Sequence, residues 1–367
     1  MNRRKLCLVI PSLQAGGMER VMSELAQYFT TLAGNEVHLV LYGISREIFY
    51  PVNGNTIVHT PRFKFNNNWR LFYTLKTLFY LRRTIRRINP FSILSFGEYW
   101  NNFLLLSTFG LNFPVFVSDR SQPDKSLGWF QDTLRRQLYP RARGLIFQTE
   151  KAKEIFLMKN KHPNVIVIGN PVRLFADCQI PLNRENIVLM VGRLIKSKHQ
   201  DKLIEMFASI DNPDWKLLLV GYDHLKQNNM ERLKELANTL KVEDKVIFTG
   251  KKYEVEEIYL NSSVFAFTSS SEGFPNAIGE AMSAGLPVVA FDCVAGPAEM
   301  ISDGYNGFLV PDSDFSLFQT RLNQLMKDKE LRSRLGSNAR KSITRFSHDN
   351  ICEAFYRFIT DIKHSEK

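Results

Sequence analysis

The sequence predicts an α/β protein built from two Rossmann-like, doubly wound parallel-sheet domains that face a cleft. Short apolar runs alternate with amphipathic helical patterns along the chain, which is typical of βαβ units. The alternation restarts after a polar stretch at 171–186 that contains two prolines. With 367 residues, the chain is also too long for one compact core.

The first domain is expected over residues 1–172. Its strands are predicted from apolar runs, and the patterns at 19–32 and 69–88 predict helices. The predicted strands are 6–10, 37–41, 93–95, 115–117, 144–147 and 164–168.

The second domain is expected over residues 173–346. Helical patterns again separate its strands, and the tail from residue 316 is mostly helical. The segment 347–367 contains a last helix with no strand after it, which we expect to pack back toward the first domain. The predicted strands are 187–191, 216–220, 246–248, 264–268 and 287–290.

Positive charge is concentrated in the first part of the chain. The net charge is +11, and residues 1–150 carry 19 Lys and Arg against 9 Asp and Glu, whereas the remainder is nearly neutral. The two halves therefore meet different partners. Four scattered cysteines form no C-x-x-C pair, which argues against a zinc site or a disulfide framework and fits a reducing interior.

The segment 269–285, Ser-Ser-Ser-Glu-Gly-Phe-Pro-Asn-Ala-Ile-Gly-Glu-Ala-Met-Ser-Ala-Gly, follows an apolar strand and opens a helix near Asn276. Unpaired amides at a helix start suit a phosphate. Glu272 in the preceding loop and Glu280 one turn inside the helix could hold hydroxyls on either side of a pyrophosphate. Alternatively, Glu272 caps the helix and Glu280 lies on its solvated face.

A second motif, Val-Gly-Arg-Leu-Ile-Lys-Ser-Lys at 191–198, follows the first strand of the second domain. Arg193 and Lys198 are cations on a strand-to-helix turn, where doubly wound sheets bind ligands. Arg can bind two phosphate oxygens at once, and Lys supplies a compact charge. The alternative is two solvated surface cations. Their shared turn favours phosphate binding.

Taken together, these motifs resemble those of glycosyltransferase family 4. The resemblance extends to Phe-Thr-Gly at 248–250, to the segment 296–311, and to Gly-Gly-Met-Glu-Arg at 16–20 after the first strand. It covers essentially the whole chain. Members of this family are retaining enzymes of the GT-B fold, so the resemblance implies transfer of a sugar from a nucleotide diphosphate donor with retention of anomeric configuration.

The resemblance also implies roles for individual residues. Arg193 and Lys198 would neutralise the donor pyrophosphate, Glu272 would contact the transferred sugar, and Glu280 would bind the ribose. Further donor contacts are implied for Gly16 and Gly17, for the amides of Asn276, Ala277 and Ile278, and, beside the base, for the segment Gly250 to Tyr253.

No metal or other cofactor is expected, because two cations and a helix N-terminus can stabilise a diphosphate leaving group. The triplet Asp312-Ser-Asp314 resembles a metal-binding Asp-x-Asp motif, but it stands where the family has a polar loop. We therefore interpret it as part of that loop.

The acceptor side of the protein is expected to meet a membrane. Residues 48–97 contain no Asp or Glu and eight Lys or Arg. Within them, the helix predicted at 69–88 places apolar residues largely on one side and Lys76, Arg83 and Arg87 on another. A basic amphipathic helix of this kind binds anionic headgroups or a lipid-linked pyrophosphate. The alternative is a helix packed on its sheet with a solvated basic face.

Many relatives carry a donor-contacting His in the first domain, and none occurs in the corresponding regions here. Asp119 is the candidate for acceptor activation and Arg120 for binding acceptor or donor phosphate. A surface pair between Asp119 and Arg120 is the alternative, and front-face transfer needs no side-chain base because the departing phosphate can take the proton.

The sequence thus predicts a cytoplasmic hexosyltransferase, peripheral on the inner face of the cell membrane, that acts on a lipid-linked saccharide in surface-glycan assembly. Nucleic-acid binding is not expected, because base-reading motifs are missing. A nucleotide-sugar 2-epimerase or a non-catalytic glycan- or lipid-binding relative remain alternatives. An NAD-dependent oxidoreductase is disfavoured because Gly16-Gly17 does not extend to G-x-G-x-x-G.

Overall fold

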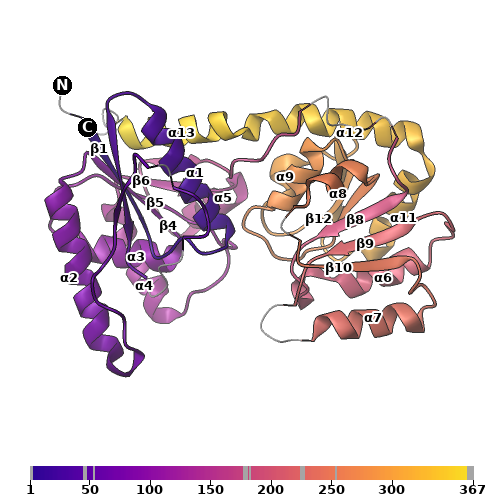
Figure 1. Ribbon diagram of the computed structural model, residues 1–367, viewed down its shortest axis with the longest axis horizontal. Helices are drawn as coiled ribbons and strands as arrows, with labels where there is room; N and C mark the ends of the chain where they lie inside the picture. Colours follow the sequence, from indigo (N-terminus) through magenta and orange to yellow (C-terminus); the bar gives the residue numbers. More distant parts are fainter. Residues whose placement is uncertain are drawn as a thin grey trace. The chain divides into compact units, whose positions relative to one another are not determined.

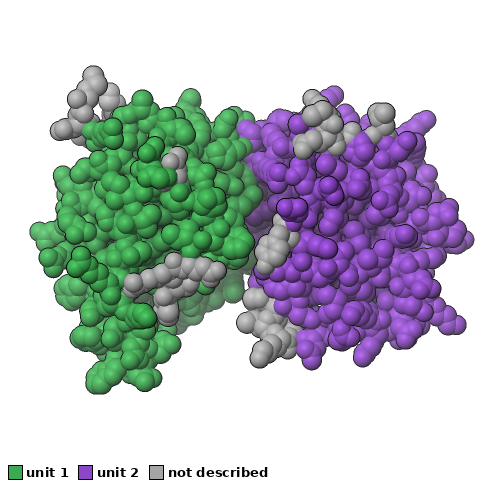
Figure 2. All heavy atoms as spheres, in the orientation of Figure 1, with its two compact units in different colours: residues 1–171, 348–367 green, residues 172–347 purple. Residues whose placement is uncertain are grey.

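The computed structural model describes residues 3–43, 48–52, 54–176, 181, 183–223, 228–252 and 254–361. The chain divides into two compact units, shown in Figure 2. Unit 1 comprises residues 1–171 together with 348–367, and unit 2 comprises residues 172–347. The C-terminal helix therefore belongs to unit 1.

Unit 1 contains a seven-stranded parallel sheet of order β3-β2-β1-β4-β5-β6-β7. The strands are β1 (Arg4–Ile10), β2 (Asn35–Leu41), β3 (Ile57–His59), β4 (Ser92–Phe96), β5 (Val115–Ser118), β6 (Gly144–Phe147) and β7 (Val165–Val167). The central strands are mostly apolar and buried because helices cover both faces of the sheet.

The helices of unit 1 form the two layers that bury this sheet. They are α1 (Gly17–Thr31), η1 (Asn67–Trp69), α2 (Arg70–Ile88), α3 (Glu98–Ser107), α4 (Trp129–Leu138), η2 (Tyr139–Arg141), α5 (Glu150–Lys159) and α13 (His348–Thr360). In Figure 1, α2, α3 and α4 lie on one face, and α1 and α13 lie on the other.

The last helix is anchored to unit 1 by aromatic packing. Phe355 of α13 lies 5.7 Å, centroid to centroid, from Phe96 of β4, and Phe358 lies 5.4 Å from Phe116 of β5. A Cβ atom at Gly144 would come within 2.7 Å of the Phe358 ring, so β6 needs glycine at that position.

Unit 2 contains a six-stranded parallel sheet of order β10-β9-β8-β11-β12-β13. Its strands are β8 (Ile187–Val191), β9 (Lys216–Val220), β10 (Val246–Gly250), β11 (Val264–Phe267), β12 (Val288–Asp292) and β13 (Gly307–Pro311). Its helices are η4 (Lys196–Lys198), α6 (Gln200–Ala208), α7 (Asn229–Thr239), α8 (Glu256–Asn261), α9 (Asn276–Ser283), α10 (Pro297–Met300), α11 (Phe315–Lys327), α12 (Lys329–Ile343) and η5 (Thr344–Phe346).

The two parallel sheets confirm the predicted fold class. In unit 2, α6, α7 and α11 pack on one face of the sheet, and α8 and α9 pack on the other (Figure 1). Across the described residues, no helix combines the length and the hydropathy that crossing a bilayer requires.

Candidate active site

The turn after β8 lies against the turn after β9. The amide of Gly192 donates to the carbonyl of Val220 over 2.9 Å, and a Cβ atom at Gly221 would overlap the Gly192 carbonyl oxygen at 1.8 Å. Gly221 is therefore required for the close approach of the two turns. The side chain of Gln200 fixes the same turn by donating to the carbonyl of Arg193 over 2.9 Å.

Lys198 and Glu272 meet at this edge of the sheet, where the strands end at their carboxyl termini. The Lys198 ammonium forms an ion pair with Oε1 of Glu272, and both side chains are about 15% exposed. The hydroxyl of Thr268 donates to the Lys198 carbonyl over 2.7 Å, and the ammonium lies 5.2 Å from the centroid of the Phe267 ring. The end of β11 thus positions both members of the pair.

Arg193 supplies a second cation to the same turn. Its side chain is exposed and, within the described part of the chain, has no ion pair. The stem of Lys198 passes the turn closely, since a Cβ atom at Gly192 would lie 3.8 Å from Lys198 Cε. The site therefore holds one cation neutralised by a carboxylate and one available to an anion.

The start of α9 has fewer available amides than predicted. The amide of Asn276 donates to the Phe274 carbonyl and that of Ile278 to the Pro275 carbonyl, each over 3.0 Å. Ile278 is also fully buried. Among the described residues, the Ala277 amide has no acceptor. The prediction that three amides face a ligand is therefore corrected to one, because the turn itself uses the other two.

The side chain of Glu280 is oriented by a hydrogen bond from a buried residue of unit 2. The hydroxyl of Tyr259, on α8, donates to Oε2 of Glu280 over 2.9 Å, and Tyr259 is fully buried. Burial and the adjacent carboxylate raise the pKa of Tyr259 well above its usual value, so its hydroxyl remains a donor. Glu280 therefore has a fixed orientation, unlike a solvated surface carboxylate.

In unit 1, Asp119 lies at the end of β5 in a buried network. Its carboxylate forms an ion pair with Arg135 and accepts from the Tyr139 hydroxyl over 2.5 Å and from the Asn101 amide over 3.3 Å. Burial raises the pKa of Asp119 to about 6, against the opposing effect of Arg135. Both carboxylate oxygens are occupied. The structure therefore disfavours Asp119 as the group that activates an acceptor.

Arg120 does not pair with Asp119 either. Its guanidinium stacks over the Phe96 ring at 3.6 Å and donates to Asn170 Oδ1 over 2.6 Å. Its backbone amide donates to the buried Glu98 carboxylate over 3.0 Å. Burial lowers the pKa of Arg120 to about 9, and Glu98 and Asp119 oppose that effect. The alternative of a surface pair between Asp119 and Arg120 is therefore wrong, because each side chain belongs to a separate buried arrangement.

Gly16 and Gly17 stand at the junction of β1 and α1. A Cβ atom at Gly16 would overlap the Glu19 carboxylate at 2.2 Å, so glycine is needed for the side chain of Glu19 to fold back over the turn. Tyr253, at the end of the segment implied to border the base, and Cys178 lie outside the described residues.

Two family models match consecutive parts of the chain. Glycosyltransferase Family 4 matches residues 15–174, and Glycosyl transferases group 1 matches residues 178–342. The amylovoran biosynthesis glycosyltransferase AmsD of Erwinia amylovora is 30% identical over 349 residues, covering 91% of this chain and 93% of that protein. The chain belongs to glycosyltransferase family 4.

Two further similarities cover almost the whole glycosyltransferase. A Campylobacter jejuni protein, GalNAc-alpha-(1->4)-GalNAc-alpha-(1->3)-diNAcBac-PP-undecaprenol alpha-1,4-N-acetyl-D-galactosaminyltransferase, is 22% identical over 98% of this chain and 99% of its own. Anabaena Alr3699/HepE in complex with UDP and glucose superposes with a TM-score of 0.80 at 19% identity, over 98% of this chain and 100% of its own. The second similarity establishes the fold alone.

The Asp312-Ser-Asp314 triplet of the glycosyltransferase has a structural role at the start of α11. Oδ1 of Asp314 accepts from the Leu317 amide over 3.0 Å and so caps α11. Across the described residues, no group of three or more His, Cys, Asp or Glu side chains is arranged to hold a metal ion.

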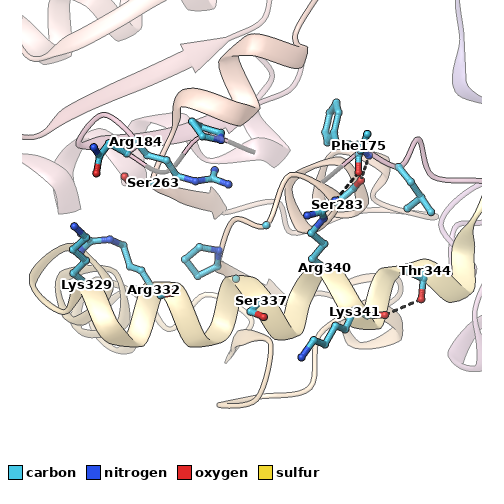
Figure 3. A pocket seen from close by; sticks show the side chains of 18 of the residues that line it. Phe175, Arg184, Ser263, Ser283, Lys329, Arg332, Ser337, Arg340, Lys341 and Thr344 are labelled. Carbon is cyan, nitrogen blue, oxygen red and sulfur yellow. Dashed lines mark hydrogen bonds between the residues drawn. The ribbon is translucent and has the colours of Figure 1, made fainter. Parts of the chain in front are cut away.

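A cavity of about 830 Å³ in unit 2 of the glycosyltransferase lies at the opposite edge of its sheet (Figure 3). It is lined by α12 and by residues that precede β8, β11 and β12, where the strands begin. Its Arg340 donates to the Phe175 carbonyl over 2.8 Å, and Arg184 donates to the Ser262 carbonyl over 2.9 Å. These arginines hold backbone carbonyls, and the cavity is distinct from the turn that carries Lys198.

The basic helix of the glycosyltransferase departs from the expected arrangement. The side of α2 that faces the sheet is formed by Thr77, Leu81, Thr84, Ile85 and Ile88. Four of its other large apolar side chains are exposed, on the same solvent side as the basic residues. Exposed fractions are 75% for Leu71, 57% for Phe72, 48% for Leu75 and 70% for Phe79.

The basic residues of α2 have different surroundings. Lys76 lies over aromatic rings, 4.7 Å from the centroid of Phe63 and 5.8 Å from that of Phe72. Arg83 and Arg87 are exposed. The first turn of α4 adds two exposed rings that no sequence motif indicated, Trp129 at 82% and Phe130 at 62%.

Proposed function

We propose that this protein is a retaining glycosyltransferase that moves a hexosyl or N-acetylhexosaminyl unit from a nucleotide diphosphate to a hydroxyl of a saccharide acceptor. The supporting observation is the pairing of Lys198 with Glu272 on the turn that also presents the exposed Arg193. A diphosphate leaving group needs cations where its charge develops, and a sugar needs a carboxylate beside its hydroxyls.

In this proposal the donor pyrophosphate binds Arg193 first and then competes with Glu272 for Lys198. The exchange places phosphate oxygens on the ammonium and releases Glu272 to contact the transferred sugar. The Ala277 amide is available to the same phosphate, while Glu280, oriented by Tyr259, accepts from the ribose hydroxyls. Interactions that strengthen as the leaving group gains charge lower the barrier.

The departing phosphate takes the proton of the acceptor hydroxyl on the face from which it leaves. This route needs no side-chain base, in keeping with the occupied carboxylate of Asp119. It also gives an α-linked product from an α-linked donor. The cations of the turn neutralise the phosphate, so we propose that transfer requires neither a metal nor another cofactor.

For the donor we propose a UDP-linked hexose or N-acetylhexosamine. The structurally similar Anabaena protein has been solved with UDP and glucose, and the Campylobacter relative is named as an N-acetylgalactosaminyltransferase acting on a PP-undecaprenol saccharide. The Campylobacter name supports a lipid-linked acceptor, which we assign to surface polysaccharide or lipopolysaccharide synthesis.

We further propose that the enzyme works at the cytoplasmic face of the membrane. The solvent side of α2 combines exposed apolar residues with Arg83 and Arg87, a pairing that favours an anionic bilayer surface. An ordinary solvated helix face would not expose Leu71 and Phe72 to this extent.

The test is a transfer assay with the full chain, UDP-glucose, UDP-galactose and their N-acetylhexosamine counterparts, and membrane lipid extracts as acceptors. The expected result is UDP release that needs acceptor, persists in EDTA and yields an α-linked product by NMR. A β-linked product or an absolute need for a divalent metal would contradict the mechanism. Conversion of a donor in the absence of acceptor would favour the epimerase alternative.

A further inference from the structure

The cavity of about 830 Å³ in unit 2 is strongly basic. Its volume lies within the range of about 300 to 1,000 Å³ that small-molecule sites have. The described residues that line it include no Asp or Glu, and five of them are cations: Arg184, Lys329, Arg332, Arg340 and Lys341. The second half of the chain is nearly neutral as a whole, so this concentration of positive charge is local. A cavity of this charge favours an anionic ligand.

One side of α12 carries three of these cations with two hydroxyl groups between them. Lys329 and Arg332 lie toward the start of the helix and Arg340 toward its end. Ser333 and Ser337 line the cavity between the two places. Arg340 follows Arg332 by eight positions, which is about 12 Å along the helix axis. The cavity therefore offers positive charge at two places, joined by a polar wall.

Arg184 adds a second cation to the place that Arg340 occupies. Figure 3 shows Arg340 on the side of α12 that faces Arg184. A Cβ atom at Gly285 would lie 3.5 Å from Nη2 of Arg184 and 4.0 Å from Cδ of Arg340, so both side chains border the same glycine. Burial lowers the pKa of Arg184 to about 10, and repulsion from Arg340 adds to the effect. An anion between the two guanidinium groups would offset this repulsion.

Hydrogen bonds to backbone carbonyls leave part of this basic lining available. Arg332 donates through Nη1 to the Leu325 and Met326 carbonyls, over 2.7 and 2.9 Å, so its Nε and Nη2 have no acceptor among the described residues. Burial lowers the pKa of Arg332, and Asp328, which caps α12 outside the lining, opposes that effect. Lys329 is exposed and has no ion-pair partner in the part of the chain that the structure describes. Carbonyl contacts alone therefore do not account for the charge of the cavity.

We propose that this cavity binds a sugar bisphosphate, either free or as part of a nucleoside. One phosphate group lies between Arg184 and Arg340, and the other contacts Arg332. The hydroxyl groups of the sugar lie along the serine side chains between these two places. A single phosphate, or two phosphates linked directly to each other, would reach only one of them. This site lies at the opposite edge of the sheet from the donor turn, and the inference goes beyond the proposed transferase function.

The experiment measures the thermal stability of the full chain with sugar bisphosphates, at saturating UDP and constant ionic strength. The panel comprises fructose 1,6-bisphosphate, glucose 1,6-bisphosphate and adenosine 3′,5′-bisphosphate, which distinguishes free sugars from a nucleoside. At about ten times its Kd, at least one of them should raise Tm by about 2 to 4 °C through mass action. Inorganic phosphate and pyrophosphate at the same concentration should give less than half of that rise, and fructose should give none.

Two variants locate the binding. Arg332→Gln should reduce the rise by at least half, measured against the Tm of the same variant without ligand, because this change also removes the carbonyl contacts. Lys329→Gln should reduce the rise as well, and it alters an exposed side chain. The matched control is Arg334→Gln, which removes an exposed cation of α12 outside the cavity lining and should retain the full rise.

The proposal fails if no bisphosphate stabilises the wild-type protein or if pyrophosphate gives an equal rise. It also fails if the rise survives in both Arg332→Gln and Lys329→Gln, or if Arg334→Gln lowers it as much as Lys329→Gln does.

Lys198→Ala separates this site from the donor turn. The rise produced by the bisphosphate should persist in this variant without UDP, and its loss there would assign the ligand to the donor turn and overturn the proposal. Loss of the UDP response with a normal bisphosphate response would contradict no part of the cavity assignment, and it would bear on the proposed function in the opposite way if the UDP response persisted in full.

Discussion

Lys198 and Glu272 stand 74 positions apart in the sequence and form an ion pair at the carboxyl edge of the unit 2 sheet. The pair neutralises the ammonium before any donor arrives, so a phosphate must displace a carboxylate to reach it. Arg193, exposed on the same turn, has no such competitor among the described residues. The two cations should therefore contribute differently to donor binding and to transfer.

Glu272→Gln should separate binding from chemistry. We expect turnover to fall by about 100-fold or more, because a carboxylate beside the transferred sugar is lost. UDP affinity should be unchanged or a few-fold higher, since Lys198 no longer has to leave a charged partner. Steady-state kinetics and titration calorimetry measure the two effects. Glu231→Gln, which alters an exposed ion pair of the same unit, is the control. An equal loss of UDP affinity would contradict the assignment.

Glu280 should give the enzyme its preference for ribose. Wild-type protein should bind UDP about tenfold more tightly than 2′-deoxy-UDP, because a hydrogen bond to a carboxylate is lost with the hydroxyl. The preference should disappear in Glu280→Ala. It should shrink in Tyr259→Phe, which removes the 2.9 Å hydrogen bond that orients Glu280. Competition binding measures the ratios, and a preference that survives in Glu280→Ala would place the ribose elsewhere.

Asp119 should prove structural. Asp119→Asn places an amide donor among the donors of Arg135, Tyr139 and Asn101, so we expect a loss of about 1 to 3 kcal/mol in the free energy of unfolding at pH 7. Turnover of the folded variant should stay within about threefold of wild type. Urea unfolding and kinetics test this pair of outcomes. A stable variant with a large loss of kcat would restore Asp119 as a catalytic group.

The same carboxyl should make unfolding depend on pH. Burial raises the pKa of folded Asp119 from its usual 3.8 to about 6, so the folded protein binds this proton more tightly than the unfolded chain. The stability linked to the protonated group is present below about pH 4 and is lost as the pH rises toward 6. Urea unfolding should show that, as the pH rises across this window, the free energy of unfolding of the wild type falls relative to that of Asp119→Asn. A difference in the free energy of unfolding that does not change with pH would mean that Asp119 does not titrate between pH 4 and 6.

Membrane binding should depend on two separable features of α2. Phe72→Ser with Leu75→Ser should weaken binding to all vesicles. Arg83→Gln with Arg87→Gln should weaken it by about tenfold only on phosphatidylcholine vesicles that contain phosphatidylglycerol. Cosedimentation of the full chain measures both, and Met158→Ser, which removes a 75%-exposed apolar side chain elsewhere in unit 1, is the control. Equal binding by all variants would assign α2 to an ordinary surface.

Continuous apolar runs mark the strands that sequence patterns revealed, including β7 and β10 at the edges of their sheets. The two missed strands, β3 and β13, lie at the edges of their sheets. In β3, Ile57 is 43% exposed, and β13 both begins with Gly307 and ends with Pro311. An edge position alone does not hide a strand, because β7 and β10 were predicted. The three residues of β3 are too few for a recognisable run, and the Gly and Pro that bound β13 are typical of a turn.

The meeting of Lys198 with Glu272 could be anticipated because both residues follow strands closely, and the carboxyl ends of parallel strands share one edge of the sheet. The surroundings of Asp119 could not be anticipated, because its partner is Arg135, on α4, and not the adjacent Arg120. A cavity of about 900 Å³ at the carboxyl edge of the unit 1 sheet, lined by Tyr42 and Trp100, could not be predicted. Its walls come from five separate segments, and no local pattern encodes their convergence.

The most direct test of the proposed donor site at Arg193, Lys198 and Glu272 is the stabilisation of the protein by UDP. It is measured as the rise in Tm at saturating UDP, in the wild type and in Lys198→Ala. Arg193 should leave only a small residual response in the variant, so most of the rise should vanish. A full wild-type rise in Lys198→Ala would show that the nucleotide diphosphate does not bind where Lys198 and Glu272 meet.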